Sequence, residues 1–275
     1  LFGWPIIPSS IAGWILSSAD RYFIEHFSTT SELGLYSLGF QISSVLTVVI
    51  LQPFRTVWPA IFYPKSKEQD APNVFGKFFT YFLLITSVFG LCLIAGAEPM
   101  IQLLGPKEYW HAHVVVPILV FCLILGDTGV QSIITIGLYL QKKTKYVPII
   151  VAIGALINIV LNWLLVPRYG MMGAAVATLV CSILMTLMCY LLNTIFYPIK
   201  LEMKRICHLT IILILLVILN YHIAINSFIL MIVVKSILII MFPILLYLTH
   251  FFDDQEKNVL KSIREKGLSY IFEKS

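Results

Sequence analysis

The sequence predicts an all-α protein, a polytopic membrane helix bundle with about eight transmembrane helices. Hydrophobic residues make up 59% of the 275 residues, and charged residues make up only 12%. A soluble domain of this length cannot bury so much apolar surface, so lipid must solvate most of the chain. The apolar residues are gathered into long stretches, and the connections between them carry lysine and arginine mainly on alternate sides.

The predicted spans follow from the length of the apolar stretches. A helix crosses a bilayer with roughly 20 mostly apolar residues. By this measure we expect spans at 1–24, 34–63, 76–97, 112–141, 146–167, 170–197, 206–222 and 226–251. A turn at the polar cluster of Asn220, His222 and Asn226 divides the last two spans. Without this turn the count falls to seven and the carboxy terminus changes side.

Basic residues in the connections indicate the topology. One set of connections holds only Lys107 and Arg168. The other set, together with the tail, holds a much larger group: Lys65, Lys67, Lys77, Lys142, Lys143, Lys145, Lys200, Lys204, Arg205, Lys257, Lys261, Arg264, Lys266 and Lys274. Because lysine and arginine accumulate in cytoplasmic loops, we expect both ends of this segment in the cytoplasm and an even number of spans.

The two ends of the chain carry further expectations. The sequence begins inside an apolar stretch, without methionine or a basic segment, so we expect no signal peptide and interpret it as the downstream part of a longer protein. Residues 253–275 begin with two aspartates and continue with apolar residues at helical spacing. This pattern predicts an amphipathic helix resting on the cytoplasmic membrane surface.

Composition and motifs exclude several functions. The five cysteines form no CxxC pair, and His111 and His113 have no further ligand nearby in sequence, so we expect no metal and no cofactor. The net charge of +5 reflects the loop bias and requires no nucleic-acid partner. No phosphate-binding glycine loop, HExxH motif or nucleophile elbow is present, so the sequence proposes no enzymatic reaction.

Ionisable residues inside the spans are the first functional candidates. Each costs about 2.5–3.5 kcal/mol at the bilayer centre and needs a partner, a cavity or a route to the interface. For Asp20 and Arg21, near the outer end of the first span, both an interfacial position and a cavity remain open. Arg55 lies roughly 12 Å along the helix from the inner boundary, which favours a water-filled cavity. Lys235, in the last span, fits a lysine that reaches the interface.

Asp127 stands out because it lies in the middle of an uncharged run. Its carboxylate must be paired with a cation or protonated, and a structural hydrogen bond between helices is the alternative role. Gly126 and Gly129 beside it permit a local break in the helix. Asn158 and Asn162 lie four residues apart on one helix face, which favours interhelical hydrogen bonding.

Six short segments form a recognisable pattern by their order and spacing: 8–11 (PSSI), 18–24 (SADRYFI), 32–37 (ELGLYS), 137–144 (GLYLQKKT), 158–170 (NIVLNWLLVPRYG) and 173–178 (GAAVAT). They resemble the carboxy-terminal half of Wzx-type polysaccharide and O-antigen flippases, in the multidrug/oligosaccharidyl-lipid/polysaccharide exporter (MOP) superfamily. The resemblance covers about residues 1–200, and the last two spans match no motif.

The resemblance implies a fold of two six-helix lobes around a central cavity, often followed by two extra helices. Residues 1–200 would form the second lobe, 201–252 the two extra helices and 253–275 the cytoplasmic tail. The implied substrate is an undecaprenyl-pyrophosphate-linked oligosaccharide, moved across the cytoplasmic (inner) membrane for surface polysaccharide biosynthesis by an ion gradient. The implied partners are this lipid-linked oligosaccharide, the lipid bilayer, the missing amino-terminal lobe and a polysaccharide polymerase.

The resemblance also suggests roles for the charged residues. Arg21 and Arg55 would bind the pyrophosphate of the substrate, and Asp127 and Asp20 would act in ion coupling or gating. Two other functions remain as alternatives. One is a multidrug/cation antiporter of the same superfamily, which would need an acidic, aromatic-lined cavity. The other is a membrane-embedded glycan polymerase or ligase, which the short outer loops disfavour.

Overall fold

The computed structural model describes residues 6–223, 227–253 and 256–257, and this part of the chain contains helices and no strands. The prediction of an all-α helix bundle is therefore confirmed. The helices are α1 (Ile6–Phe27), α2 (Thr30–Leu46), the π-helical turn η1 (Thr47–Leu51), α3 (Gln52–Lys65), α4 (Ala71–Leu104), the 3-10 helix η2 (Lys107–Val114), α5 (Val116–Leu125), α6 (Gln131–Ile134), α7 (Ile136–Leu140), α8 (Tyr146–Phe196), α9 (Met203–His222) and α10 (Phe228–Leu248).

In the described residues, five helices are long and apolar enough to cross a membrane. The number is six when η2 and α5 are taken as one bent span. This number is smaller than the expected eight for two reasons. The 51-residue α8 contains two of the expected spans, and α1, which carries Asp20, Arg21 and Glu25, does not meet the criterion. The predicted tail lies largely outside the described residues.

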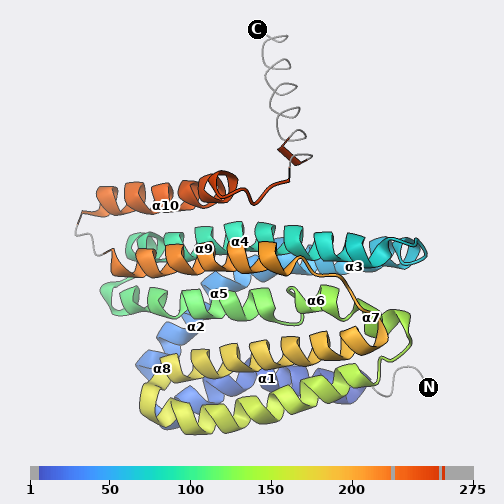
Figure 1. The fold of residues 1–275 in the computed structure, drawn as a ribbon. Coiled ribbons are helices and arrows are strands. Elements are labelled where there is room, and N and C mark those ends of the chain that lie inside the picture. The colour runs from blue at the N-terminus through green and yellow to red at the C-terminus, as the bar shows by residue number, and fades with distance from the viewer. Residues whose placement is uncertain (1–5, 224–226, 254–255, 258–275) are drawn as a thin grey trace.

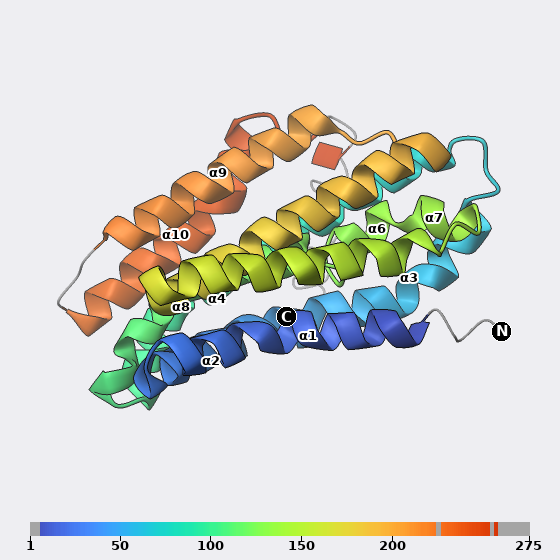
Figure 2. The same ribbon diagram turned by 90° about the horizontal axis from the view of Figure 1, so that it is seen from below.

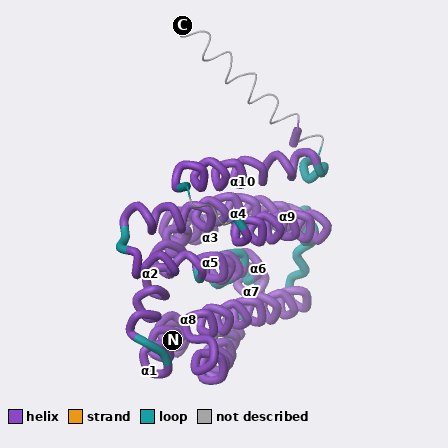
Figure 3. The backbone as a smooth tube through the Cα atoms, turned by 90° about the vertical axis from the view of Figure 1, so that its left-hand side faces the viewer, coloured by secondary structure: helices purple, strands orange, loops and turns teal. Residues whose placement is uncertain are grey.

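The bundle is layered (Figures 1 and 3). α1 packs along α8, α5 packs against α8 on the inner side, α4 packs against α5, and α9 and α10 pack on α4. Figure 1 shows the connections α3–α4, α7–α8 and α8–α9 at the same end of the bundle. The lysine-rich connections therefore share one end, and the turns with Lys107 and Arg168 lie at the other.

Two long helices are interrupted. α2, η1 and α3 follow one another as a single 36-residue helix, and the π-helical turn ends two residues before Pro53. Pro53 has no N–H, so the regular hydrogen-bond ladder cannot continue through it. The expected span 112–141 is broken more strongly. α5 ends at Leu125, residues 126–130 are not helical, and two short helices follow. The break that Gly126 and Gly129 permit is thus present, with Asp127 inside it.

α8 is a helical hairpin whose halves run side by side in opposite directions (Figure 2). The reversal occurs at Gly170, which has φ 54° and ψ −133°, a conformation that only glycine adopts without strain. The Glu32 carboxylate accepts hydrogen bonds from the Met171 N–H (2.8 Å) and from the Ser28 hydroxyl (2.7 Å). Glu32 therefore satisfies a backbone donor where the second half of α8 begins.

Gly170→Ala should destabilise the protein by about 1–3 kcal/mol, because the new Cβ both strains the backbone and clashes with the Glu32 carboxylate. Thermal unfolding of the detergent-solubilised protein measures this loss. Gly96→Ala is the matched control, since a Cβ at Gly96 meets no atom within 4 Å. Equal stability of the two variants would show that the turn does not depend on Gly170.

A buried ion pair joins α10 to α4. Lys235 Nζ donates to Glu98 Oε2, and only 4% of the Lys235 side chain is exposed. The expectation that Lys235 reaches the interface is therefore wrong. Its amine is held inside the helix pair, because α4 extends to Leu104 and so brings Glu98 within reach.

Arg205, near the start of α9, holds the chain segment that follows α10. Its guanidinium pairs with Glu202 and Glu256 and lies 3.8 Å from Asp253. Burial raises the pKa of Glu256, but hydrogen bonds from Tyr81 and from the Asp253 N–H and the charge of Arg205 outweigh it and leave this pKa below its ordinary value. The carboxylate therefore stays ionised and fixes this segment against α4 and α9.

Candidate functional site

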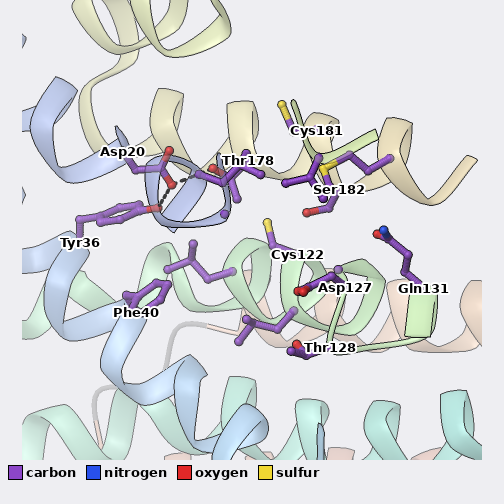
Figure 4. A pocket seen from close by; sticks show the side chains of 17 residues that line it. Asp20, Tyr36, Phe40, Cys122, Asp127, Thr128, Gln131, Thr178, Cys181 and Ser182 are labelled. Atoms are coloured by element: carbon purple, nitrogen blue, oxygen red, sulfur yellow. Dashed lines mark hydrogen bonds between the residues drawn. The ribbon is translucent and has the colours of Figure 1, made fainter. Parts of the chain in front are cut away.

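A cavity of about 390 Å³ lies inside the bundle, between α1, α2, α5, α8 and the break that follows α5 (Figure 4). Most of its wall is apolar, but it includes two carboxylates, Asp20 and Asp127. The other polar groups that line it are Tyr36, Thr128, Gln131, Thr178 and Ser182. No lysine or arginine is among the described residues that line this cavity.

Asp20 is buried, with 5% of its surface exposed, although it is ionisable. It accepts hydrogen bonds from the Tyr36 hydroxyl (2.5 Å) and the Thr178 hydroxyl (2.7 Å) on one oxygen. The other oxygen accepts from the Asn162 amide (2.9 Å) and, at 3.5 Å, from the Asn158 amide. The carboxylate thus joins α1, α2 and both halves of α8. Of the two positions left open for Asp20, the interface and a cavity, the structure shows the cavity.

Asn158 and Asn162 are fully buried, and both orient toward Asp20. Asn158 also donates to the Thr178 hydroxyl at 3.1 Å. The side-chain oxygen of Asn162 is buried and accepts no hydrogen bond from the residues that the structure describes. A buried polar atom without a partner is uncommon in native proteins. The atom of Asn162 that faces Asp20 is the amide nitrogen, so this oxygen is a separate acceptor among the packed helices.

Asp127 and Arg55 form the second charged group of the site. Arg55 Nη1 lies 3.3 Å from Asp127 Oδ2, and the two side chains are 54% and 62% exposed. The sequence left open whether Asp127 is paired with a cation or protonated, and the structure shows the pair. This ion pair consists of a single contact between exposed groups, and such pairs contribute little to the free energy of unfolding.

Arg21 does not contact either carboxylate in the described structure. Its guanidinium lies over the ring of Phe40, 4.7 Å from the centroid. Phe40 lines the cavity, as Asp127 does. Both arginines therefore contact a residue of the cavity wall from outside the cavity.

The sequence indicated some members of this site and missed others. The structure brings Asp20 together with Asn158 and Asn162, and Asp127 together with Arg55. Tyr36 and Thr178 were missed as partners of Asp20, since nothing local distinguishes a buried tyrosine or threonine from its neighbours. Both lie within the segments 32–37 and 173–178, whose pattern was the one available signal.

The helix bundle and its long apolar helices define a multi-pass membrane protein, with an internal, mainly apolar cavity that contains two carboxylates. The chain belongs to the MatE family, whose characteristic sequence pattern matches residues 5–164. This match contains α1 to α7 and the first part of α8, so it includes every element that lines the cavity except the second half of α8.

The chain is also similar to the probable low-salt glycan biosynthesis flippase Agl15 of Haloferax volcanii. The two are 26% identical over 181 residues, which is 62% of this chain and 36% of the relative. The chain thus spans about a third of the length of the curated relative it matches. No solved structure matches the chain.

Proposed function

We propose that this chain is the carboxy-terminal lobe of a flippase that moves a lipid-linked oligosaccharide across the cytoplasmic membrane for surface polysaccharide biosynthesis. Membership of the MatE family and the similarity to a glycan biosynthesis flippase support this class of function. Residues 1–200 form the lobe, 201–252 add two helices, and 253–275 form a tail on the cytoplasmic side. The amino-terminal lobe and a polysaccharide polymerase are the proposed partners.

The observation that carries the proposal is the buried Asp20 centre. A buried carboxylate that lines the cavity and is held by four hydrogen-bond donors can bind and release a cation, either sodium or a proton. Because it connects α1, α2 and both halves of α8, occupation by a cation changes how these helices hold together. A cation gradient can then drive movement of the lobe.

The arginines supply the opposite charge. Arg55 is half exposed, and Arg21 lies at the wall of the same cavity on Phe40. Guanidinium groups bind phosphate oxygens through several parallel hydrogen bonds, which suits a pyrophosphate headgroup. The substrate of this proposal is therefore a polyprenyl pyrophosphate that carries an oligosaccharide, with undecaprenyl as the expected lipid.

One observation favours the multidrug/cation antiporter instead. The lining of the cavity is acidic and includes Tyr36 and Phe40, as expected for a site that binds organic cations. Drug susceptibility and surface glycan, measured together in a deletion strain, distinguish the two functions. The flippase loses glycan display, and the antiporter loses drug resistance.

Arg55→Ala and Asp127→Asn should each reduce surface polysaccharide display by roughly tenfold in the full-length protein at normal expression, the effect of losing about 1.4 kcal/mol of interaction with the headgroup or the ion. Arg168→Ala, at the exposed turn of α8, is the control and should display normally. Wild-type display from both site variants would reject the proposal. Formation of new glycosidic bonds by the purified protein would indicate the enzyme alternative.

A further inference from the structure

We propose that the Arg55–Asp127 ion pair is a substrate-responsive switch, in which an anionic diphosphate takes Arg55 and leaves a free carboxylate that draws a cation into the cavity toward Asp20. This inference rests on the proposed function, because it assigns an order to substrate and ion binding at the same site. It also assigns the side of the cavity at which the cation enters, which is the side of Asp127.

The first step of the argument is the asymmetry of the two carboxylates. Both line one cavity, but Asp20 is 5% exposed and is surrounded by hydrogen-bond donors, whereas the side chain of Asp127 is 62% exposed. Figure 4 shows Asp20 and Asp127 on different parts of the cavity wall. A cation from solvent therefore meets Asp127 before it meets Asp20, and the cavity that both carboxylates line connects them.

The second step is the weakness of the ion pair. Arg55 touches Asp127 through one nitrogen at 3.3 Å and does not itself line the cavity. A guanidinium has five N–H donors, so most of its donors remain available to another anion. A diphosphate carries more charge than a carboxylate and accepts parallel hydrogen bonds, so it competes effectively for Arg55.

The third step is the change of charge at the cavity. While Arg55 neutralises Asp127, the entry side of the cavity has little net charge. After the exchange Asp127 is a free anion, and a cleft of one charge sign with apolar walls concentrates ions of the other sign. The position of Asp127 in the break after α5 lets its carboxylate turn from Arg55 toward the cavity without unwinding a regular helix.

The cavity contains its own reporters for a test. Cys122 and Cys181 line it and are 6% and 2% exposed. Cys92, Cys189 and Cys207 are not among its lining residues. With these three replaced by alanine in the full-length protein, reaction with methanethiosulfonate reagents reports access to the cavity. The cationic 2-aminoethyl and the anionic 2-sulfonatoethyl reagents then distinguish access by charge.

The experiment measures the labelling rate of Cys122 and Cys181 in membrane vesicles by mass spectrometry, with inorganic pyrophosphate as the probe and sulfate at matched ionic strength as its control. Pyrophosphate should raise the rate of the cationic reagent about tenfold and lower that of the anionic reagent. Arg55→Gln should give the fast cationic rate without pyrophosphate. Asp127→Asn should remove both increases.

Three results would overturn the switch: no effect of pyrophosphate in the protein with Arg55 and Asp127 intact, an equal increase for both reagents, or no labelling even in Arg55→Gln. The display assay separates this inference from the proposed function. If Arg55→Ala loses display but pyrophosphate does not change labelling, the arginine binds substrate and the switch is wrong. If display is normal in both site variants, the proposed function is wrong.

Discussion

Asp20→Asn should abolish cation-dependent transport while the protein remains folded, the largest functional effect that we expect from a single substitution. The asparagine side chain keeps the size of the aspartate. Its oxygen can accept from Asn162 and Asn158, and its amide can donate to the hydroxyls of Tyr36 and Thr178, which also act as acceptors. The negative charge is lost, and the hydrogen-bonded junction is kept.

The expected magnitude follows from the charge. A unit charge at 4 Å from a carboxylate gains about 4 kcal/mol at an effective dielectric constant of 20. Its loss corresponds to roughly a thousandfold in cation affinity. The protein with Asp20 intact should show a melting temperature that depends on sodium, against choline at equal ionic strength, or on pH. Asp20→Asn should lose the sodium dependence, or show a smaller pH dependence if the cation is a proton, and should display little surface glycan.

Asp20→Leu is the companion variant, because it removes charge and hydrogen-bond acceptors together. Each donor left without a partner costs about 1–3 kcal/mol, so this variant should melt well below Asp20→Asn. A sodium dependence that persists in Asp20→Asn, or a pH dependence as large as in the protein with Asp20 intact, would place the cation elsewhere. Normal display from Asp20→Asn would remove Asp20 from the transport mechanism.

The predicted and the observed positions of Asp20 show what the sequence can and cannot predict. The hydropathy pattern placed Asp20 near the end of the predicted span, because the apolar stretch ends where the polar residues begin. The helix continues to Phe27, so Asp20 lies about two turns inside, and its burial depends on helices that are distant in sequence. The spacing of Asn158 and Asn162 did predict a shared polar face, because a helix repeats locally.

The pairing of Arg55 with Asp127 could likewise be predicted only in part. The sequence showed that Arg55 and Asp127 each need a partner or water, since hydrocarbon excludes isolated charges. That they meet across 72 positions depends on the packing of α3 beside the break after α5. Glu98 was missed altogether, because the apolar stretch ends at residue 97 while α4 extends to Leu104. Because Glu98 was not among the candidate residues, the sequence offered no partner for Lys235.

Lys235→Met should destabilise the protein by about 3–5 kcal/mol, the usual cost of leaving one member of a buried ion pair without its partner. Glu98 keeps only a long contact from Gln102 Nε2, at 3.3 Å, to its other oxygen. Because Lys235 and Glu98 form an ion pair between α10 and α4, we expect α10 to separate from α4 at a lower temperature in this variant. Thermal unfolding in detergent measures the loss, and cross-linking of paired cysteines in α4 and α10 locates it.

The double variant Lys235→Met with Glu98→Leu tests whether the loss comes from an unpaired charge. Two apolar side chains of similar size can replace a buried pair at little cost, so the double variant should recover most of the stability. Lys65→Met is the matched control, because Lys65 and Glu68 form an ion pair with 37% and 55% of their side chains exposed, and such pairs contribute less than about 1 kcal/mol. If Lys235→Met melts like Lys65→Met, the ion pair does not hold α10 to α4. If the double variant stays as unstable as the single one, the packing of the lysine chain and not its charge stabilises this interface.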